Sequence, residues 1–258
     1  MLSYQHAYHA GNMADVVKHA ALAWVLDYLV QKPKPLSYIE THAGRALYDL
    51  GSPEAAKTGE AAQGIARALP RIAADHPYRR TIEAIRAEHG PMAYPGSPLV
   101  ARHLLREDDR LTLCELHPQE AAALRAALPG VTVKQADGPA TALSLAPPDP
   151  RRGLCLIDPS YEVKTEYEAM PKLVRDLHRK WNVGVLMLWY PVLRNGTHRA
   201  MTRALDGLGL PSLRHEAAFP PARDGHGMIG TGLYVVNPPW GLDAALSEIE
   251  GWIPGGKI

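Results

Sequence analysis

Hydrophobic residues fall into short runs, each ended by a small or acidic residue and followed by a stretch with helical spacing. This alternation predicts parallel strands joined by helices, because a strand buried on both faces is an almost continuous apolar run. We predict six strands, at Pro35–Glu40, Leu111–Glu115, Val131–Gln135, Gly153–Asp158, Val183–Trp189 and Gly232–Asn237. A seventh strand is expected near Arg214–Phe219.

Two helical regions accompany these strands. Met13–Val30 has apolar residues at helical spacing, with Asn12 as the predicted N-cap and Asp15 in the first turn. About seventy residues separate the first two predicted strands, more than one connecting helix needs. Within them, residues 53–92 are rich in Ala, Arg and Glu at helical spacing. We therefore predict one α/β domain, residues 1–258, with a small inserted helical subdomain at 53–92.

Composition narrows the class of protein. Hydrophobic residues make up 46% and charged residues 21%, as in ordinary globular proteins, and the net charge of +1 neither requires nor excludes a nucleic-acid partner. Cys114 and Cys155 lie in apolar runs, which predicts buried, reduced thiols. The absence of a long apolar run and of a signal-like N-terminus predicts a cytoplasmic protein with no membrane contact.

The tetrad Asp158-Pro159-Ser160-Tyr161 follows the predicted strand GLCLI and therefore stands at the carboxyl edge of the sheet, where ligands of open α/β sheets bind. It resembles the (D/N)-P-P-(Y/F/W) motif of methyltransferases that modify an exocyclic amine of adenine or cytosine. Such an amine is a poor nucleophile because its lone pair is delocalised into the ring. Hydrogen bonds from the amine to Asp158 and to the Pro159 carbonyl would draw the nitrogen toward tetrahedral geometry, and Tyr161 would stack on a base rotated out of its helix.

Taken alone, the tetrad is equally consistent with a strand-ending turn, because Asp, Pro and Ser favour turns. Polar residues at three other strand ends shift the balance toward a nucleoside cofactor. They are Glu40, His42 and Gly44 after the first strand, Glu115 at the end of the second, and Asp137-Gly138 after the third. An acid at the second strand would accept the ribose hydroxyls, and the third strand end would bind the adenine amine. The lack of a G-x-G-x-x-G motif disfavours a dinucleotide.

A second segment, Asn237-Pro238-Pro239-Trp240, matches the amino-methyltransferase motif better in letters. It follows the last predicted strand, which runs antiparallel in methyltransferase sheets and would place this segment away from the cofactor edge. We therefore predict that Trp240 stacks against the sheet and that Asn237 is not catalytic. The histidines His6, His9 and His19 lack acids or cysteines at a familiar ligand spacing, so no metal site is predicted.

Segments spread over essentially the whole chain together resemble the RlmJ family, whose members methylate N6 of a specific adenine in bacterial 23S ribosomal RNA. They are MLSYQHAYHAGNMADVVKH, THAG, YPGSPL, LCELHP, DPSYE, LWYP and the NPPW near the end. The resemblance implies a Rossmann-like class I S-adenosylmethionine-dependent methyltransferase fold, with a seven-stranded, mostly parallel sheet and an inserted helical subdomain. It also implies a monomer.

The resemblance assigns roles to particular residues. Asp158 would be catalytic, with Pro159 and Tyr161 completing the site for the amine and the base. Tyr4 would contact the substrate RNA. The residues that would hold or adjoin S-adenosylmethionine are Lys18, His19, His42, Gly44, Ser97, Glu115, Asp137 and Gly138. The chain departs from the strict pattern at Ser160, where a second proline is usual, and in the loop AGRALY, whose single glycine is Gly44.

Three alternatives remain open. A DNA adenine-N6 methyltransferase would use the same catalytic residues. The basic clusters Arg79-Arg80, Arg151-Arg152 and Arg175–Lys180 would suit either nucleic-acid backbone, although Arg79-Arg80 is better explained as a solvated helix face. The small insertion favours RNA, because a site-selecting DNA enzyme would carry a larger target-reading region. A non-catalytic RNA-binding scaffold and a small-molecule amine methyltransferase are the other two, the last predicting a closed pocket.

Overall fold

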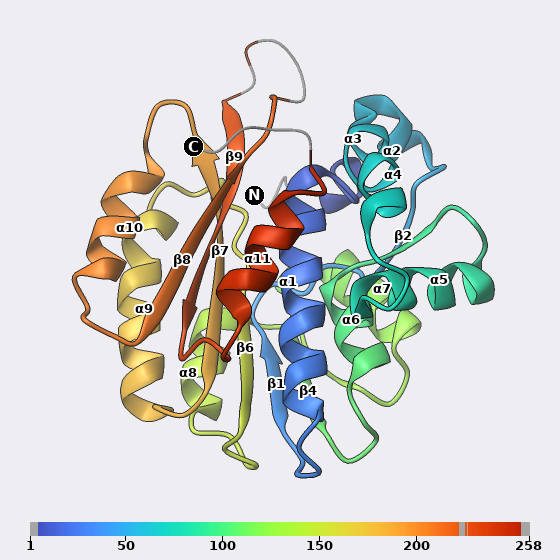
Figure 1. The fold of residues 1–258 in the computed structure, drawn as a ribbon. Helices are drawn as coiled ribbons and strands as arrows, with labels where there is room; N and C mark the ends of the chain where they lie inside the picture. The colour runs from blue at the N-terminus through green and yellow to red at the C-terminus, as the bar shows by residue number, and fades with distance from the viewer. Residues whose placement is uncertain (1–4, 222–224, 226, 254–258) are drawn as a thin grey trace.

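A computed structural model of the chain describes residues 5–221, 225 and 227–253. Its centre is a seven-stranded sheet in the order β5-β4-β1-β6-β7-β9-β8 (Figure 1). The strands are β1 (Ser37–Glu40), β4 (Arg110–Cys114), β5 (Thr132–Lys134), β6 (Gly153–Ile157), β7 (Val185–Leu193), β8 (Ser212–Ala218) and β9 (Met228–Val236). All six predicted strands and the expected seventh are therefore present, with ends that differ from the prediction by a few residues.

Strand direction determines which loops meet at each edge of the sheet. Strands β1, β4, β5, β6 and β7 pair in parallel, whereas β9 is antiparallel to both β7 and β8. The loops that follow β1, β4, β5 and β6 consequently lie at one edge, and the end of β9 lies at the other. This arrangement confirms the predicted Rossmann-like, mostly parallel methyltransferase fold.

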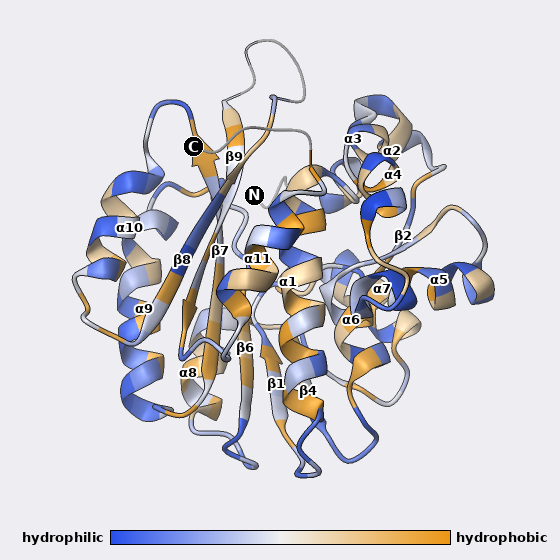
Figure 2. Cartoon of the chain, viewed as in Figure 1, coloured by the Kyte–Doolittle hydropathy of each residue, from blue (hydrophilic) through white to orange (hydrophobic). Residues whose placement is uncertain are grey.

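Helices cover both faces of the sheet (Figure 1). On one face, α1 (Met13–Val30), α5 (Pro77–His89), α6 (Ser97–Leu104), α7 (Pro118–Ala127) and α11 (Leu242–Glu250) share a core cluster; on the other lie α8 (Gly138–Leu145), α9 (Glu166–Lys180) and α10 (His198–Asp206). Alternation along β6 separates the two cores, because Leu154 and Leu156 face the first and Cys155 and Ile157 the second. Figure 2 shows strands β1 and β7 coloured mainly as hydrophobic and the lower turns of α9 coloured as hydrophilic.

The stretch between β1 and β4 contains the predicted helices. They are α2 (Pro53–Thr58), α3 (Glu60–Gln63), α4 (Ile65–Ala68), the 3-10 turn η2 (Leu69–Arg71) and α5. A short antiparallel ladder of β2 (Leu47–Asp49) and β3 (Ala93–Pro95) brings the two ends of this stretch together. The ladder was not predicted, because strands of three residues leave no hydrophobic period in the sequence.

Helix α1 begins as predicted, with the Asn12 side chain accepting a hydrogen bond from the Asp15 backbone N–H, and a short 3-10 turn, η1 (His6–Tyr8), precedes it. Fourteen of its residues are buried, because it packs against α5, α6, α11 and β9 at once. A helix enclosed on most sides has no separate polar face. Its polar residues Asp15, Lys18 and His19 are therefore buried too, each no more than 5% exposed.

Candidate functional site

A cavity of about 1280 Å³ opens at the carboxyl edge of the parallel strands. Its volume exceeds the usual 300–1,000 Å³ of a single-ligand pocket, so it has room for a nucleoside cofactor and a nucleobase together. Every predicted site residue that the structure describes lines it. They are Lys18, His19, His42, Gly44, Ser97, Glu115, Asp137, Gly138, Asp158, Pro159 and Tyr161. Tyr4 lies outside the described residues.

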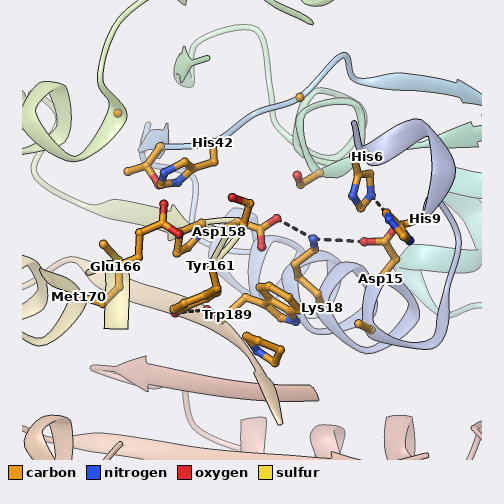
Figure 3. A pocket seen from close by; sticks show the side chains of 18 of the residues that line it. His6, His9, Asp15, Lys18, His42, Asp158, Tyr161, Glu166, Met170 and Trp189 are labelled. Carbon is orange, nitrogen blue, oxygen red and sulfur yellow. Dashed lines mark hydrogen bonds and ion pairs between the residues drawn. The ribbon is translucent and has the colours of Figure 1, made fainter. Parts of the chain in front are cut away.

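Asp158 lies next to the buried end of Lys18 (Figure 3). The Lys18 Nζ is 2.6 Å from the Asp158 Oδ2 and 3.2 Å from the Asp15 Oδ1. Burial by itself lowers the pKa of Lys18, but the two carboxylates outweigh it and raise the pKa above its ordinary value. Lys18 is therefore a fixed positive charge beside the catalytic candidate, and it also lies 5.4 Å from the centre of the Trp189 ring.

Asp15 joins this ion pair to the segment that precedes α1. Its Oδ2 accepts hydrogen bonds from the Gly11 N–H and from His6, both at 2.9 Å. Burial favours a higher pKa for Asp15, yet the charges of His6 and Lys18 hold the pKa well below its usual value. The carboxylate is consequently ionised and holds Lys18, His6 and the chain entering the helix in one geometry.

The tetrad after β6 forms a bent segment in the cavity wall. Tyr161 has a φ of 57°, in the left-handed region that non-glycine residues adopt at a cost of about 1–3 kcal/mol. Its hydroxyl donates to the Trp189 carbonyl at 2.9 Å, and its ring packs 4.5 Å from the ring of Tyr167. These contacts hold the ring at the cavity wall, beside Pro159 and Trp189.

The end of β1 and the start of α6 meet at the buried carboxyl group of Glu40. Ser97 donates to the Glu40 Oε1 at 2.5 Å, and Tyr38 donates to the Oε2 at 2.8 Å. Burial raises the pKa of Glu40 to about 8, so the group is mostly protonated at neutral pH. The neighbouring His19 is neutral, because burial lowers its pKa to about 3, and its Nδ1 lies 3.0 Å from the Tyr94 hydroxyl.

The turn after β1 packs closely against two other strand ends. The Gly44 N–H donates to the Glu115 Oε2 at 2.8 Å, and a Cβ at Gly44 would lie 2.5 Å from the Tyr48 hydroxyl. A Cβ at Gly138 would lie only 1.8 Å from the Thr41 carbonyl oxygen. Glycine is thus required at Gly138 by close approach to the backbone, and at Gly44 by a φ of 63°, in the left-handed region. Beside this turn, burial lowers the pKa of His42 to about 4 and keeps its imidazole neutral.

The residues at the ends of β4 and β5 suit a nucleoside. The Glu115 carboxylate is half-buried and faces the cavity, and the adjoining Leu116 side chain lines it while remaining 49% exposed. Asp137 caps α8 by accepting from the Ala140 N–H at 2.7 Å, and it lines the same cavity. An acid for ribose hydroxyls, an apolar side chain for a purine face and a second acid thus fit an adenosyl group.

The second motif-like segment lies at the opposite edge of the sheet. The Asn237 side chain donates to the backbone carbonyls of Asn182 and Gly184, at 3.0 and 2.8 Å, and does not line the cavity. Its predicted distance from the site is confirmed by the antiparallel direction of β9. The predicted stacking of Trp240 against the sheet is wrong, because its side chain is 87% exposed: the chain has already left β9 when it reaches this residue.

Two further features of the described residues bear on the predicted partners. No group of three or more His, Cys, Asp or Glu side chains within residues 5–221, 225 and 227–253 is arranged to hold a metal ion. In the same part of the chain, no helix combines the length and the apolar character that a membrane crossing requires. Cys114 and Cys155 are buried and unbridged, as predicted.

Sequence reasoning missed Asp15 and Trp189 as members of the site. Asp15 was interpreted as an ordinary acid in the first turn of a helix. The available signal was its spacing of three residues from Lys18, which places an acid and a base on the same side of an otherwise apolar helix. Trp189 lies in a strand, where an aromatic residue normally indicates only core packing.

Comparisons with known proteins agree with this geometry. Residues 33–255 match the family described as "Ribosomal RNA large subunit methyltransferase D, RlmJ". The ribosomal RNA large subunit methyltransferase J of Escherichia coli K12 is 40% identical over 98% of this chain and 93% of its own length; that of Haemophilus influenzae is 38% identical over 96% and 92%. A crystal structure of a Legionella pneumophila protein superposes with a TM-score of 0.86 at 36% identity, over 94% of this chain and 92% of that one. This chain belongs to the RlmJ family of ribosomal RNA large subunit methyltransferases.

Proposed function

We propose that this chain transfers the methyl group of S-adenosylmethionine to N6 of a specific adenine in 23S ribosomal RNA. The observation that carries the proposal is the position of Asp158 and Pro159 in one cavity with the strand-end residues suited to an adenosyl group. Family membership supports ribosomal RNA as the substrate, because both curated relatives are named as large-subunit ribosomal RNA methyltransferases. The choice of N6 rests on the resemblance of the tetrad to amino-methyltransferase motifs.

Binding of the methyl donor is assigned to the loops after β1, β4 and β5. Glu115 would accept the ribose hydroxyls and Asp137 the adenine amine, while His19, His42 and Ser97 would surround the amino-acid part. When bound, S-adenosylmethionine supplies a methyl group on a positively charged sulfur. Carboxylates at the strand ends favour that charge, and fixed groups achieve this without reorganising during the reaction.

The chemistry at N6 follows from the acceptors around it. In this mechanism the Asp158 Oδ1 and the Pro159 carbonyl each accept one N6–H, which localises the nitrogen lone pair and aims it at the methyl group. N6 would accept the methyl group that the bound donor supplies, with loss of the carbon–sulfur bond, and would release one of its protons to Asp158. Lys18 occupies the other Asp158 oxygen, Oδ2, at 2.6 Å, which fixes the carboxylate and leaves Oδ1 for the substrate.

The adenine must leave its helix to reach these acceptors. Tyr161 and Trp189 offer aromatic surface at the wall of the cavity, and stacking on such a surface contributes about 1–3 kcal/mol per base. The walls come from separate parts of the chain, namely the segment before α1, the stretch between β1 and β4, and α9. We further propose that residues 53–92 form a helical subdomain within a single domain of residues 1–258, and that the protein acts as a cytoplasmic monomer.

The decisive experiment measures methyl transfer from radiolabelled S-adenosylmethionine to ribosomal RNA from a strain that lacks this gene. Unmethylated DNA is assayed in parallel, and the product is digested to nucleosides. N6-methyladenosine in large-subunit RNA is expected. Label only in DNA would replace this proposal with the DNA methyltransferase alternative, and label in neither polymer, with the methyl donor bound normally, would indicate a non-catalytic RNA-binding protein.

A further inference from the structure

Two positive side chains on different walls of the cavity have no partner among the residues that the structure describes. Arg67, on α4, and Lys172, on α9, are exposed and line the cavity. Within the part of the chain that the structure describes, neither makes a side-chain hydrogen bond or an ion pair. Lys18, the other lysine of the lining, is instead buried between two carboxylates. Arg67 and Lys172 are therefore available to a ligand at the rim.

The neighbouring arginines differ from Arg67 because they bind other groups of the protein. Between β2 and β3, Arg71 donates to the Trp252 carbonyl, Arg79 pairs with Glu83, and Arg80 pairs with Asp27. None of these three lines the cavity. The same is true of the basic residues in the clusters that the sequence suggested as contacts for a nucleic-acid backbone, Arg151-Arg152 and Arg175–Lys180.

The wall that carries Arg67 is fixed to the segment before α1. The Ile65 N–H donates to the Gly11 carbonyl at 2.8 Å, and a Cβ at Gly64 would lie 2.2 Å from that oxygen. Glu60 binds His9 and Asn12, at 3.0 and 3.1 Å. This wall is thus held at a definite position beside the catalytic ion pair.

The wall that carries Lys172 lies on the other side of Asp158. Figure 3 shows Met170 of α9 to the left of Asp158 and His9, which Glu60 binds, to the right. Met170 and Leu173 pack into the second core and hold α9 against the sheet. The Lys172 side chain, which lies between them in the sequence, stays exposed. Arg67, on α4, and Lys172, on α9, therefore lie on different walls of the cavity that contains Asp158.

We propose that Arg67 and Lys172 bind the RNA phosphates on the two sides of the flipped adenosine. This inference rests on the proposed function, because it requires an adenine base to enter the cavity. The base is inserted while its backbone stays at the rim, where phosphate oxygens are matched by exposed cations. Acidic residues line the cavity as well, and two of them, Glu168 and Asp176, lie one turn from Lys172 on either side along α9. Lys172 is therefore the group of this helix face that attracts phosphate.

The test compares Arg67→Ala, Lys172→Ala and the double variant with the unchanged protein. The substrate is an RNA fragment that contains the target adenine in its unmethylated form. Its affinity is measured by fluorescence anisotropy at several salt concentrations, beside kcat and KM. Each single variant is expected to weaken RNA binding about tenfold, the factor that corresponds to about 1.4 kcal/mol. Each should also lower the slope of log affinity against log salt by about 0.7–0.9. The value of kcat and the affinity for S-adenosylmethionine should stay within about twofold.

Two controls separate a specific contact from a general loss of charge. Arg102→Ala removes an exposed arginine on α6 that does not line the cavity, and it should leave RNA affinity and the salt slope unchanged. Arg67→Lys retains the positive charge and should recover most of the salt slope.

An unchanged salt slope in the double variant would overturn the inference. Weaker binding of S-adenosylmethionine with normal RNA affinity would overturn it too, because the two cations would then belong to the cofactor site. Neither result would affect the proposed function, which is tested by methyl transfer in the unchanged protein. Conversely, if that protein binds the RNA but does not methylate it, the proposed function fails while the anisotropy measurements still decide whether these two cations bind phosphate.

Discussion

Asp158-Pro159-Ser160-Tyr161 and Asn237-Pro238-Pro239-Trp240 are similar in letters and different in surroundings. The first follows a parallel strand and has its acid paired with Lys18 in a cavity, whereas the second follows the antiparallel strand β9 and uses its amide to join two backbone carbonyls. Their aromatic residues differ as sharply, with Tyr161 8% exposed and Trp240 87% exposed. The comparison teaches that the direction of the preceding strand decides whether such a motif reaches a ligand.

The largest expected effect is the loss of turnover in Asp158→Ala. This substitution removes an acceptor for N6–H and for its proton, which should lower kcat by roughly 10³-fold. Affinity for S-adenosylmethionine, measured by calorimetry, should change little. Asp158→Asn keeps an acceptor oxygen of the kind that many amino-methyltransferase motifs contain, so it should retain measurable activity. Single-turnover chemistry at the normal rate in the alanine variant would refute the assignment of Asp158.

The next effect concerns the ion pair that distinguishes the first tetrad. Lys18→Met keeps most of the buried stem but leaves the carboxylates of Asp15 and Asp158 without their shared cation. Removing one partner of a buried pair typically costs about 3–5 kcal/mol. Urea unfolding at neutral pH should show that loss, and activity should fall with it. Equal stability of the variant and the unchanged protein would mean that the lysine does not hold these carboxylates in solution.

The difference between the two regions also shows which features of the fold and the site could be predicted from the sequence. Apolar runs predicted the strands and the polar residues at their ends, because a strand that is buried on both faces leaves a pattern in consecutive residues. The pairing of Lys18 with Asp158 spans 140 residues and leaves no such pattern. The close approach of Gly138 to Thr41 is equally non-local, and the exposure of Trp240 depends on where the chain turns after β9. Residue types and strand ends were predictable; mutual contacts were not.

A pH-dependent effect is expected from Glu40, a buried acid on β1 that pairs with β6, the strand that leads into the first tetrad. Burial raises its pKa from an ordinary value of 4.5 to about 8, so between these values the unfolded chain loses a proton that the folded protein keeps. Stability should therefore fall as pH rises through this window and become level above it. Glu40→Gln resembles the protonated acid. It should match the unchanged protein near pH 4.5 and exceed its unfolding free energy by about 2–4 kcal/mol at pH 8.5.

Urea titrations of both proteins at these two pH values would measure the difference. Parallel profiles of unfolding free energy against pH would mean that Glu40 ionises at its ordinary pKa. Ser97 and Tyr38 would then donate their hydrogen bonds to a charged carboxylate.

Asn237→Ala should have a smaller effect, confined to stability. It removes two side-chain hydrogen bonds to backbone carbonyls, each contributing about 0.5–1.5 kcal/mol, so a loss of about 1–2 kcal/mol is expected in thermal or urea unfolding. Methyl transfer by the folded variant should be unchanged, because the segment does not line the cavity. A large decrease in kcat without a loss of stability would contradict the structural role and restore the second motif as a catalytic candidate.

The smallest effect is expected from Ser160→Pro, which gives the first tetrad the proline that the second already has. Within the described part of the chain, neither the backbone N–H nor the hydroxyl of Ser160 makes a hydrogen bond, so proline removes no contact there. The groups proposed to act on the amine belong to Asp158 and Pro159, and both are retained. Steady-state kinetics should therefore give kcat and KM within about twofold of the unchanged protein. A tenfold loss would show that Ser160 donates to the substrate, and the resemblance between the two tetrads would then mislead at this position too.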